Sequence, residues 1–188
     1  MRKKKPVKVT GIGTGTDAMR LSDRPHKGVY LLPNEKASDY THLRYPGVHS
    51  FRAGRTAAIL AYKMAGIKDP INDLSFVELH DAYTSSEIQT YEDLGLCKYG
   101  EGGEMAASGQ AALGGACAVN PSGGLLACGH PVGATGLMQG VFSFWQLQNT
   151  IKEHFGNDRL QVKKPKRGLI HSHAGTGTYV TVSILEAV

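Results

Sequence analysis

Apolar and polar residues alternate near the start of the chain and then change to a helical spacing. The β-branched run from Val7 to Ile12 alternates and predicts a strand, which the glycines at 11, 13 and 15 turn into a loop. After Ser50, apolar residues recur at spacings of four, seven, eight and eleven and predict one face of a helix that ends at Gly66. This inner face consists of Ala53, Ala57, Leu60, Ala61 and Met64.

A second strand and helix follow. The short apolar run from Leu74 to Leu79 predicts a strand that ends in His80 and Asp81. A helix is expected over about Ser85 to Leu94, closed by Gly95. Because α/β sheets commonly hold ligands at the carboxyl ends of strands, His80 is well placed for chemistry.

The second half of the chain predicts a loop, a helix and two strands. Residues 98–124 are rich in glycine, alanine and serine and predict a flexible or closely packed loop, not a linker between domains. The next helix is expected to turn a wide apolar inner face, on the Phe144 and Trp145 side, toward the core. Gly168 to Ser172 and Tyr179 to Leu185 alternate as two strands joined by AGTGT, as a hairpin or an edge pair. The helix is traced by Leu137, Val141, Phe144, Trp145 and Gln148.

This order of elements predicts one α/β layer domain over residues 1–188. With 188 residues and 41% hydrophobic content, the chain can bury one sizeable core. The formal net charge is +5, but Arg2, Lys3, Lys4 and Lys5 supply four of these charges, in a basic tail over residues 1–6. No basic stripe with interleaved aromatic residues remains, so we expect no nucleic-acid partner.

Three cysteines, Cys97, Cys117 and Cys128, show no paired spacing. This pattern argues against a disulfide framework and against a zinc site, and it favours a reducing cytoplasm. No apolar run is long enough for a signal peptide or a membrane span, so we expect a soluble protein without a membrane partner.

Four loops carry candidate chemistry: ELHDAY (78–83), NPSGG (120–124), GHPVGATG (129–136) and HSHAGTG (171–177). In the third loop, His130 stands between Gly129 and Pro131, and proline restricts the residue before it. At a helix start, the helix dipole would disfavour an imidazolium and keep His130 neutral. That suits a general base or a donor to an oxyanion. From these residues alone, a structural role is equally open.

These motifs, in this order, resemble the thiolase superfamily. The similarity is greatest to the branch of sterol-carrier-protein thiolases and archaeal acetoacetyl-CoA thiolases, in which HDCF replaces the NEAF of ordinary thiolases. Thiolases consist of two βαβαβαββ halves, and this chain resembles only the C-terminal half. The resemblance therefore implies a thiolase-like layered half with a mixed sheet covered by helices. The nucleophilic cysteine would belong to an N-terminal-half partner.

The resemblance also implies roles for individual residues. His130 would activate the partner's cysteine, and His80 would orient the oxygen on which negative charge develops. Amides near Gly175 and Gly177 would form an oxyanion hole. Asn120 would mainly shape the loop behind His130 and, like these two glycines, would bind the substrate or coenzyme A. The substrate would be a coenzyme A thioester, with no covalently bound cofactor. Such proteins often associate with a small OB-fold protein that carries a zinc ribbon, in an oligomer.

The chain departs from this family at one position that matters for proton transfer. Ala82 stands where the branch has the cysteine of HDCF, and Tyr83 replaces the phenylalanine. Three interpretations remain: Tyr83 or His173 replaces the lost acid/base, the protein performs a retro-aldol cleavage, or this half is a non-catalytic scaffold. In retro-aldolases of the superfamily tyrosines replace both motif histidines, so His80 and His130 favour thioester chemistry.

Some residues have a plainer interpretation beside the chemical one. Cys128 lies two residues before His130, but a free cysteine is more often a small buried hydrophobe. His171 and His173 alternate on a strand and can face one side, yet no third ligand is suitably spaced, so no metal is expected. Asp81 is expected to cap the helix that follows it.

Overall fold

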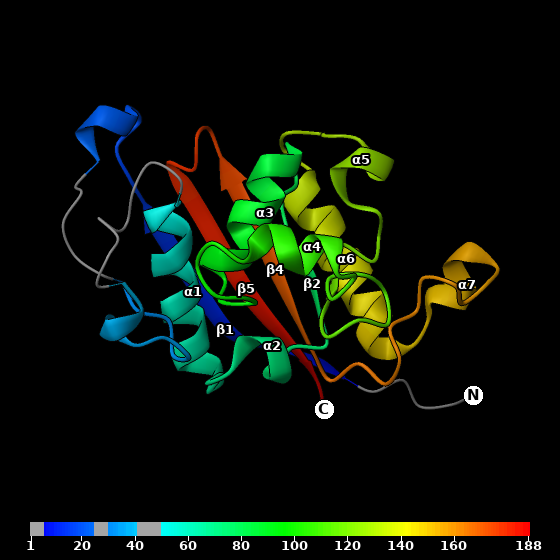
Figure 1. The fold of residues 1–188 in the computed structure, drawn as a ribbon. Helices are drawn as coiled ribbons and strands as arrows, with labels where there is room; N and C mark the ends of the chain where they lie inside the picture. The colour runs from blue at the N-terminus through cyan, green and yellow to red at the C-terminus, as the bar shows by residue number, and fades with distance from the viewer. Residues whose placement is uncertain (1–5, 25–29, 41–49) are drawn as a thin grey trace.

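A computed structural model describes residues 6–24, 30–40 and 50–188. In this part of the chain, a five-stranded sheet carries helices on both faces (Figure 1). Its main elements follow one another as βαβαβαββ, so the predicted α/β order and the mixed sheet are confirmed. Of the basic tail predicted over residues 1–6, only Pro6 lies within the described part.

The sheet has the strand order β1-β5-β4-β2-β3. β1 (Val7–Thr16), β5 (Tyr179–Ala187) and β4 (Arg167–Ala174) pair antiparallel, which confirms the predicted hairpin of the last two strands. β2 (Phe76–Glu78) pairs parallel with β4 on one side and with β3 (Ala118–Val119) on the other. Parallel pairing brings the carboxyl ends of β2 and β4 to the same edge of the sheet.

β1 is longer than predicted, because its glycines belong to the strand. A Cβ atom on Gly11, Gly13 or Gly15 would lie 2.3, 1.9 or 2.0 Å from a carbonyl oxygen of α1 (Arg52–Ala65). The prediction that the strand breaks into a loop at these glycines is wrong. Their lack of side chains instead allows the helix to pack directly on the strand.

α1 ends at Gly66, which has a φ of 68°, as predicted. The three alanines expected on its inner face are fully buried, but Leu60 and Met64 are 45% and 65% exposed. The apolar face is therefore narrower than predicted. Before α1 the described chain forms two short 3₁₀ turns, η1 (Leu21–Asp23) and η2 (Ala37–Tyr40).

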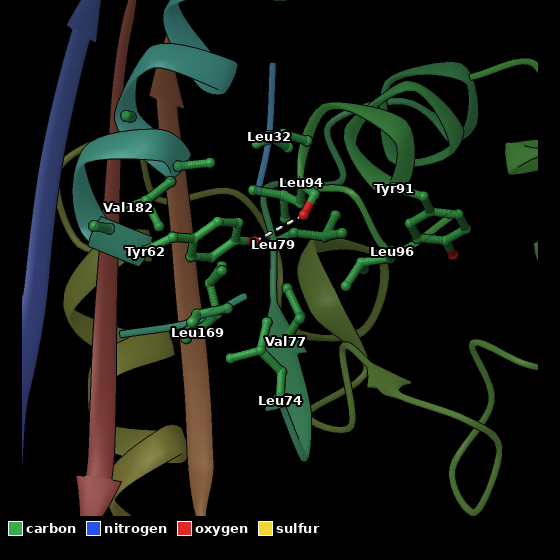
Figure 2. Packing of buried hydrophobic residues seen from close by; sticks show 14 of the residues in the cluster. Leu32, Tyr62, Leu74, Val77, Leu79, Tyr91, Leu94, Leu96, Leu169 and Val182 are labelled. Atoms are coloured by element: carbon green, nitrogen blue, oxygen red, sulfur yellow. Dashed lines mark hydrogen bonds between the residues drawn. The ribbon is translucent and has the colours of Figure 1, made fainter. Parts of the chain in front are cut away.

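The larger part of the core lies between α1, the sheet and α3 (Thr84–Asp93), as Figure 2 shows. Tyr62 of α1 is completely buried there, and its hydroxyl donates a 2.8 Å hydrogen bond to the carbonyl of Leu94. Val77 and Leu79 surround this bond with apolar contacts. The bond fixes the end of α3 against α1. The single-turn α2 (Pro70–Asp73) leads into β2.

The segment 98–124, predicted to be a flexible or closely packed loop, packs on the core and also forms short elements. It contains α4 (Gly102–Ala107) and the short strand β3. Met105 and Cys117 are 2% and 1% exposed and join these elements to the core. Glycine and alanine make this segment poor in large apolar side chains, but the segment still packs on the core.

The opposite face of the sheet is covered mainly by α6 (Thr135–Gln148), between the short helices α5 (Gly124–Cys128) and α7 (Ile151–Phe155). Its predicted inner face is wrong: Leu137, Val141 and Phe144 are 74%, 48% and 41% exposed. The helix instead buries Thr135, Gln139, Phe142, Ser143, Gln146 and Leu147. None of the helices in the described ranges combines the length and apolar character needed to cross a bilayer.

The close contact between β1 and α1 yields a stability prediction. Gly13→Ala should lower the free energy of unfolding by about 1–3 kcal/mol, because the new methyl group displaces the helix. Gly103→Ala in α4 is the matched control, since a Cβ there meets nothing within 4 Å. Urea denaturation of both variants measures the difference. Equal stabilities would show that the helix does not pack on β1 as described.

Candidate active site

Three histidines from separate loops meet at the edge where β2 and β4 end. In Figure 1 the start of α3, α5 and the turn between β4 and β5 lie toward this end of the sheet. His80 follows β2, His173 lies near the end of β4, and His130 belongs to the loop between α5 and α6. The three histidines thus come from three of the four segments that the sequence marked for chemistry.

His80 is the central member of this group. Its ring is 4.7 Å from that of His130, nearly perpendicular at 83°, and 4.3 Å from that of His173. His80 is 5% exposed, whereas His130 is exposed. We call His80, His130 and His173 the histidine cluster. His130 faces the solvent, and His80 and His173 lie deeper.

The surroundings of His130 differ from the prediction in one respect. α6 begins at Thr135, so His130 does not stand at the helix start. The carbonyl of Pro131 accepts hydrogen bonds from the amides of Ala134 and Thr135 and forms the turn that separates them. The ring of His130 instead packs against the ring of His80.

His171 lies behind the cluster, on the same side of β4 as His173, as predicted. The two rings are 5.7 Å apart. His171 is 1% exposed, and its Nδ1 accepts a long, 3.5 Å hydrogen bond from the backbone amide of His80. This contact joins the ends of β4 and β2. The described residues contain no group of three or more His, Cys, Asp or Glu side chains placed to hold a metal ion.

Burial keeps the inner histidines neutral. It lowers the pKa of His173 to about 4, with further contributions from His80 and His130. The pKa of His80 is lowered by burial and by His130, against an opposing effect of Asp81. For His171, burial lowers the pKa well below the usual value. The Nδ1 atoms of His80 and His173 are buried without a hydrogen-bond partner in the described structure. Near neutral pH these rings are therefore uncharged.

Two carboxylates at the end of β2 hold the loop that leads to His130. Glu78 accepts hydrogen bonds from the amide of Ser122 at 3.0 Å and from its hydroxyl at 2.6 Å. Burial raises the pKa of Glu78 to about 7, although the bonds from Ser122 oppose this. Asp81 accepts a 2.8 Å bond from the amide of Leu125 and so caps α5. The prediction that Asp81 caps the next helix along the chain, α3, is wrong.

Asn120 belongs to the same framework. Its Oδ1 accepts a 2.7 Å hydrogen bond from the amide of Leu79, and its own amide donates to the carbonyl of Val77 at 2.7 Å. Its φ of 45° lies in the left-handed region, which asparagine tolerates. The buried Nδ2 has no partner among the described residues. A substrate contact through Nδ2 stays a prediction.

The turn between β4 and β5 contains the two glycines predicted to serve an oxyanion hole. Gly175 and Gly177 have φ values of 60° and 71°. A Cβ on Gly177 would lie 2.3 Å from the ring of Phe51, and that ring is 5.3 Å from His173. Within the described structure, the amides of residues 175–177 donate no hydrogen bond. The turn therefore offers free donors next to the histidine cluster.

Tyr83 begins α3 and is 74% exposed. Its backbone exchanges hydrogen bonds with Ser86, which fixes the start of the helix. Its phenol ring contacts none of the histidines described above. A proton-transfer role for Tyr83 stays a prediction, whereas His173 lies inside the cluster.

None of the three cysteines has an activated thiol. Burial raises the pKa of Cys117 and of Cys97 to about 12. Cys128 is exposed, and its pKa is raised by partial burial, Glu78 and Asp81. Because the thiolate is the reactive form, these cysteines are poor nucleophiles at neutral pH.

Sequence reasoning missed two residues that shape the site. Glu78 is the one acid in an otherwise apolar strand, and this isolated charge was a usable signal for a buried partner. Phe51 gave no signal, because its contacts with His173 and Gly177 join segments more than a hundred residues apart.

Residues 35–187 match the family described as Thiolase C-terminal domain-like, and the chain belongs to this family. This confirms the resemblance inferred from the motifs. Sterol carrier protein 2 of Bos taurus is 38% identical over 136 residues, 72% of this chain and 23% of that protein. Acetyl-CoA acetyltransferase of Methanocaldococcus jannaschii is 36% identical over 161 residues, 84% of this chain and 40% of that protein.

Two further similarities define the fold and the extent of the chain. The benzoylsuccinyl-CoA thiolase subunit BbsB of Thauera aromatica is 47% identical over 88 residues, 47% of this chain and 22% of that protein. A solved structure titled Ltp2-ChsH2(DUF35) aldolase has a TM-score of 0.69 at 20% identity over 98% of this chain and 40% of its own, which shows the fold alone. The chain thus spans less than half the length of these relatives.

The low pKa of His173 yields a linkage prediction. Above the ordinary histidine pKa near 6.5, the ring is neutral in both the folded and the unfolded chain. As the pH falls toward about 4, only the unfolded chain binds the proton, so the free energy of unfolding decreases. When the pH falls from about 7.5 to about 5, the free energy of unfolding of the wild type should decrease by about 1–2 kcal/mol more than that of His173→Gln.

Urea denaturation at both pH values measures this difference. His154→Gln is the matched control, because His154 is exposed and lies outside the histidine cluster. The same pH dependence in all three proteins would show that His173 is not held neutral.

Proposed function

We propose that this domain supplies the acid/base half of a thiolase-type active site that acts on coenzyme A thioesters. The observation that carries the proposal is the histidine cluster, which places a solvent-facing imidazole, His130, against the buried, neutral ring of His80. The reaction is thiolytic cleavage of a β-ketoacyl-CoA, or the reverse Claisen condensation.

In this proposal the nucleophilic cysteine comes from an N-terminal half on another polypeptide segment. The chain's own thiols support this, because each of the three has a raised pKa. His130 accepts the proton of the incoming cysteine, and the thiolate attacks the keto carbon of the substrate. The bond between the α and β carbons then breaks, which leaves an acyl-enzyme and the enolate of acetyl-CoA. Coenzyme A thiol afterwards takes the acyl group and restores the cysteine.

The enolate carbon needs a proton that Ala82 cannot supply. His173 lies 4.3 Å from His80 by ring centroids, whereas the phenol of Tyr83 lies outside the cluster, so the geometry favours His173 as the replacement. Because His173 is neutral, it passes on to the enolate carbon the proton that His130 took from the cysteine. The free amides near Gly175 and Gly177 stabilise the negative oxygen, with His80 as a second donor. Asn120 holds the loop behind His130 and offers Nδ2 toward the thioester.

The sister half would cover the apolar residues that α6 and its approach expose. These are Leu126, Val132, Leu137, Val141 and Phe144, each at least 41% exposed. Several large apolar side chains exposed on neighbouring elements commonly mark a protein interface. A small OB-fold protein with a zinc ribbon is a further proposed partner in such an oligomer. Free cysteines accord with a cytoplasmic location.

A retro-aldol cleavage of a coenzyme A thioester is the second candidate. It is compatible with Ala82, because a retro-aldol step forms no acyl-enzyme, and the base that removes the hydroxyl proton of the substrate can return this proton to the enolate carbon. The covalent intermediate therefore distinguishes the two reactions, and a non-catalytic half would show neither.

His130→Asn tests the proposal in the complex with the sister half. Loss of the base should slow acyl-enzyme formation from acetoacetyl-CoA by about 100-fold or more and leave the assembly intact. Intact-mass measurement detects the acyl adduct, and size-exclusion chromatography reports assembly. His154→Asn is the control, since His154 stacks on Trp145 away from the cluster. Wild-type acylation by His130→Asn would refute the proposed role.

A further inference from the structure

Arg24 is a buried cation whose partners are all neutral. It is 8% exposed, and its guanidinium donates to the carbonyl of Ala18 at 3.0 Å, to the carbonyl of Thr176 at 2.6 Å and to Thr176 Oγ1 at 3.1 Å. No carboxylate pairs with it in the described structure. Burying an unpaired charge is costly, so a guanidinium kept this way commonly has a function.

The accepting carbonyl belongs to the turn between β4 and β5. The oxygen of Thr176 and the N–H of Gly177 are the two ends of one peptide group. A cation that binds the oxygen draws electron density toward it and makes the N–H of the same group a stronger donor. The amide of Gly177 donates no hydrogen bond among the described residues, so its donor capacity is unused.

The turn is also held in place from its other sides. The carbonyl of Thr178 accepts a 2.8 Å bond from the amide of Asp17, and the ring of Phe51 fills the space beside Gly177. Asp17 is itself paired with Arg52 at 3.0 Å. Asp17 and Phe51 fix the position of the turn, whereas Arg24 places a positive charge next to the peptide groups of the turn.

We propose that Arg24 is a positioning residue that fixes and polarises the Thr176–Gly177 peptide, so that the Gly177 amide stabilises an oxyanion more strongly. The inference rests on the proposed function, in which this turn faces the thioester oxygen. Arg24 precedes residues 35–187, which match the family, and so this part of the site is contributed by the segment before the family region.

The first test measures the peptide group itself in the full chain. A hydrogen bond to the oxygen of a peptide deshields its nitrogen, so Arg24→Gln should move the ¹⁵N resonance of Gly177 upfield. Arg20→Gln is the matched control, because Arg20 is an exposed arginine in the same segment. Amide resonances of Leu169 and Val182 report whether the core stays intact. An unchanged Gly177 resonance in folded Arg24→Gln would overturn the proposal.

The second test measures turnover of acetoacetyl-CoA in the complex. Arg24→Gln should lower kcat about 10-fold and change KM by less than about 2-fold, because polarisation acts on charge that develops in the transition state. Arg24→Lys keeps the charge without the planar fork and should restore part of kcat. An increase in KM at constant kcat, in either variant, would overturn the proposal.

The two tests separate this inference from the proposed function. If Arg24→Gln does not fold, the ¹⁵N resonance of Gly177 and the turnover kinetics are measured on Arg24→Lys instead. A wild-type complex without thiolase turnover would contradict the proposed function, while the upfield shift would still support the polarised peptide.

Discussion

The packing of the His80 ring between those of His130 and His173 is the contact on which the proposed chemistry depends. It brings together three loops that are far apart in the sequence, and it withdraws His80 and His173 from water. Withdrawal from water lowers the pKa values of His80 and His173, so these two rings are neutral near pH 7. They therefore place no positive charge beside His130, which receives the proton of the thiol in the proposed reaction.

The cluster keeps its geometry because the backbone around it is bonded at each entry. Glu78, Asp81 and Asn120 connect the end of β2 to the loop before His130, and the amide of His80 reaches His171 on β4. This framework reduces the stability of the fold at one point, because burial disfavours the charged form of Glu78 and raises its pKa to about 7. The site thus combines buried groups that destabilise the fold with hydrogen bonds that hold them in one arrangement.

The sequence predicted elements whose signal is local. The end of α1 at Gly66, the strand before His80 and the hairpin of β4 and β5 follow from residues within each segment. Gly13 does not distinguish a loop from a packed strand by itself, because glycine favours both loops and close packing, and only the position of α1 decides between them. The buried face of α6 and the capping of α5 by Asp81 were missed for the same reason: the partner lies elsewhere in the sequence. Motif order gave the family, but not the contacts of Arg24.

The chemistry requires that the buried His80 and the half-buried His173 stay neutral while they contact each other and the exposed His130 is next to His80. An NMR titration of ¹³C-labelled imidazoles, combined with nuclear Overhauser effects between rings, measures both properties. We expect a midpoint near pH 4 for His173, a midpoint below the ordinary value for His80, and cross-peaks from His80 to both His130 and His173. Ordinary midpoints near 6.5 for His80 and His173, without these cross-peaks, would contradict this requirement.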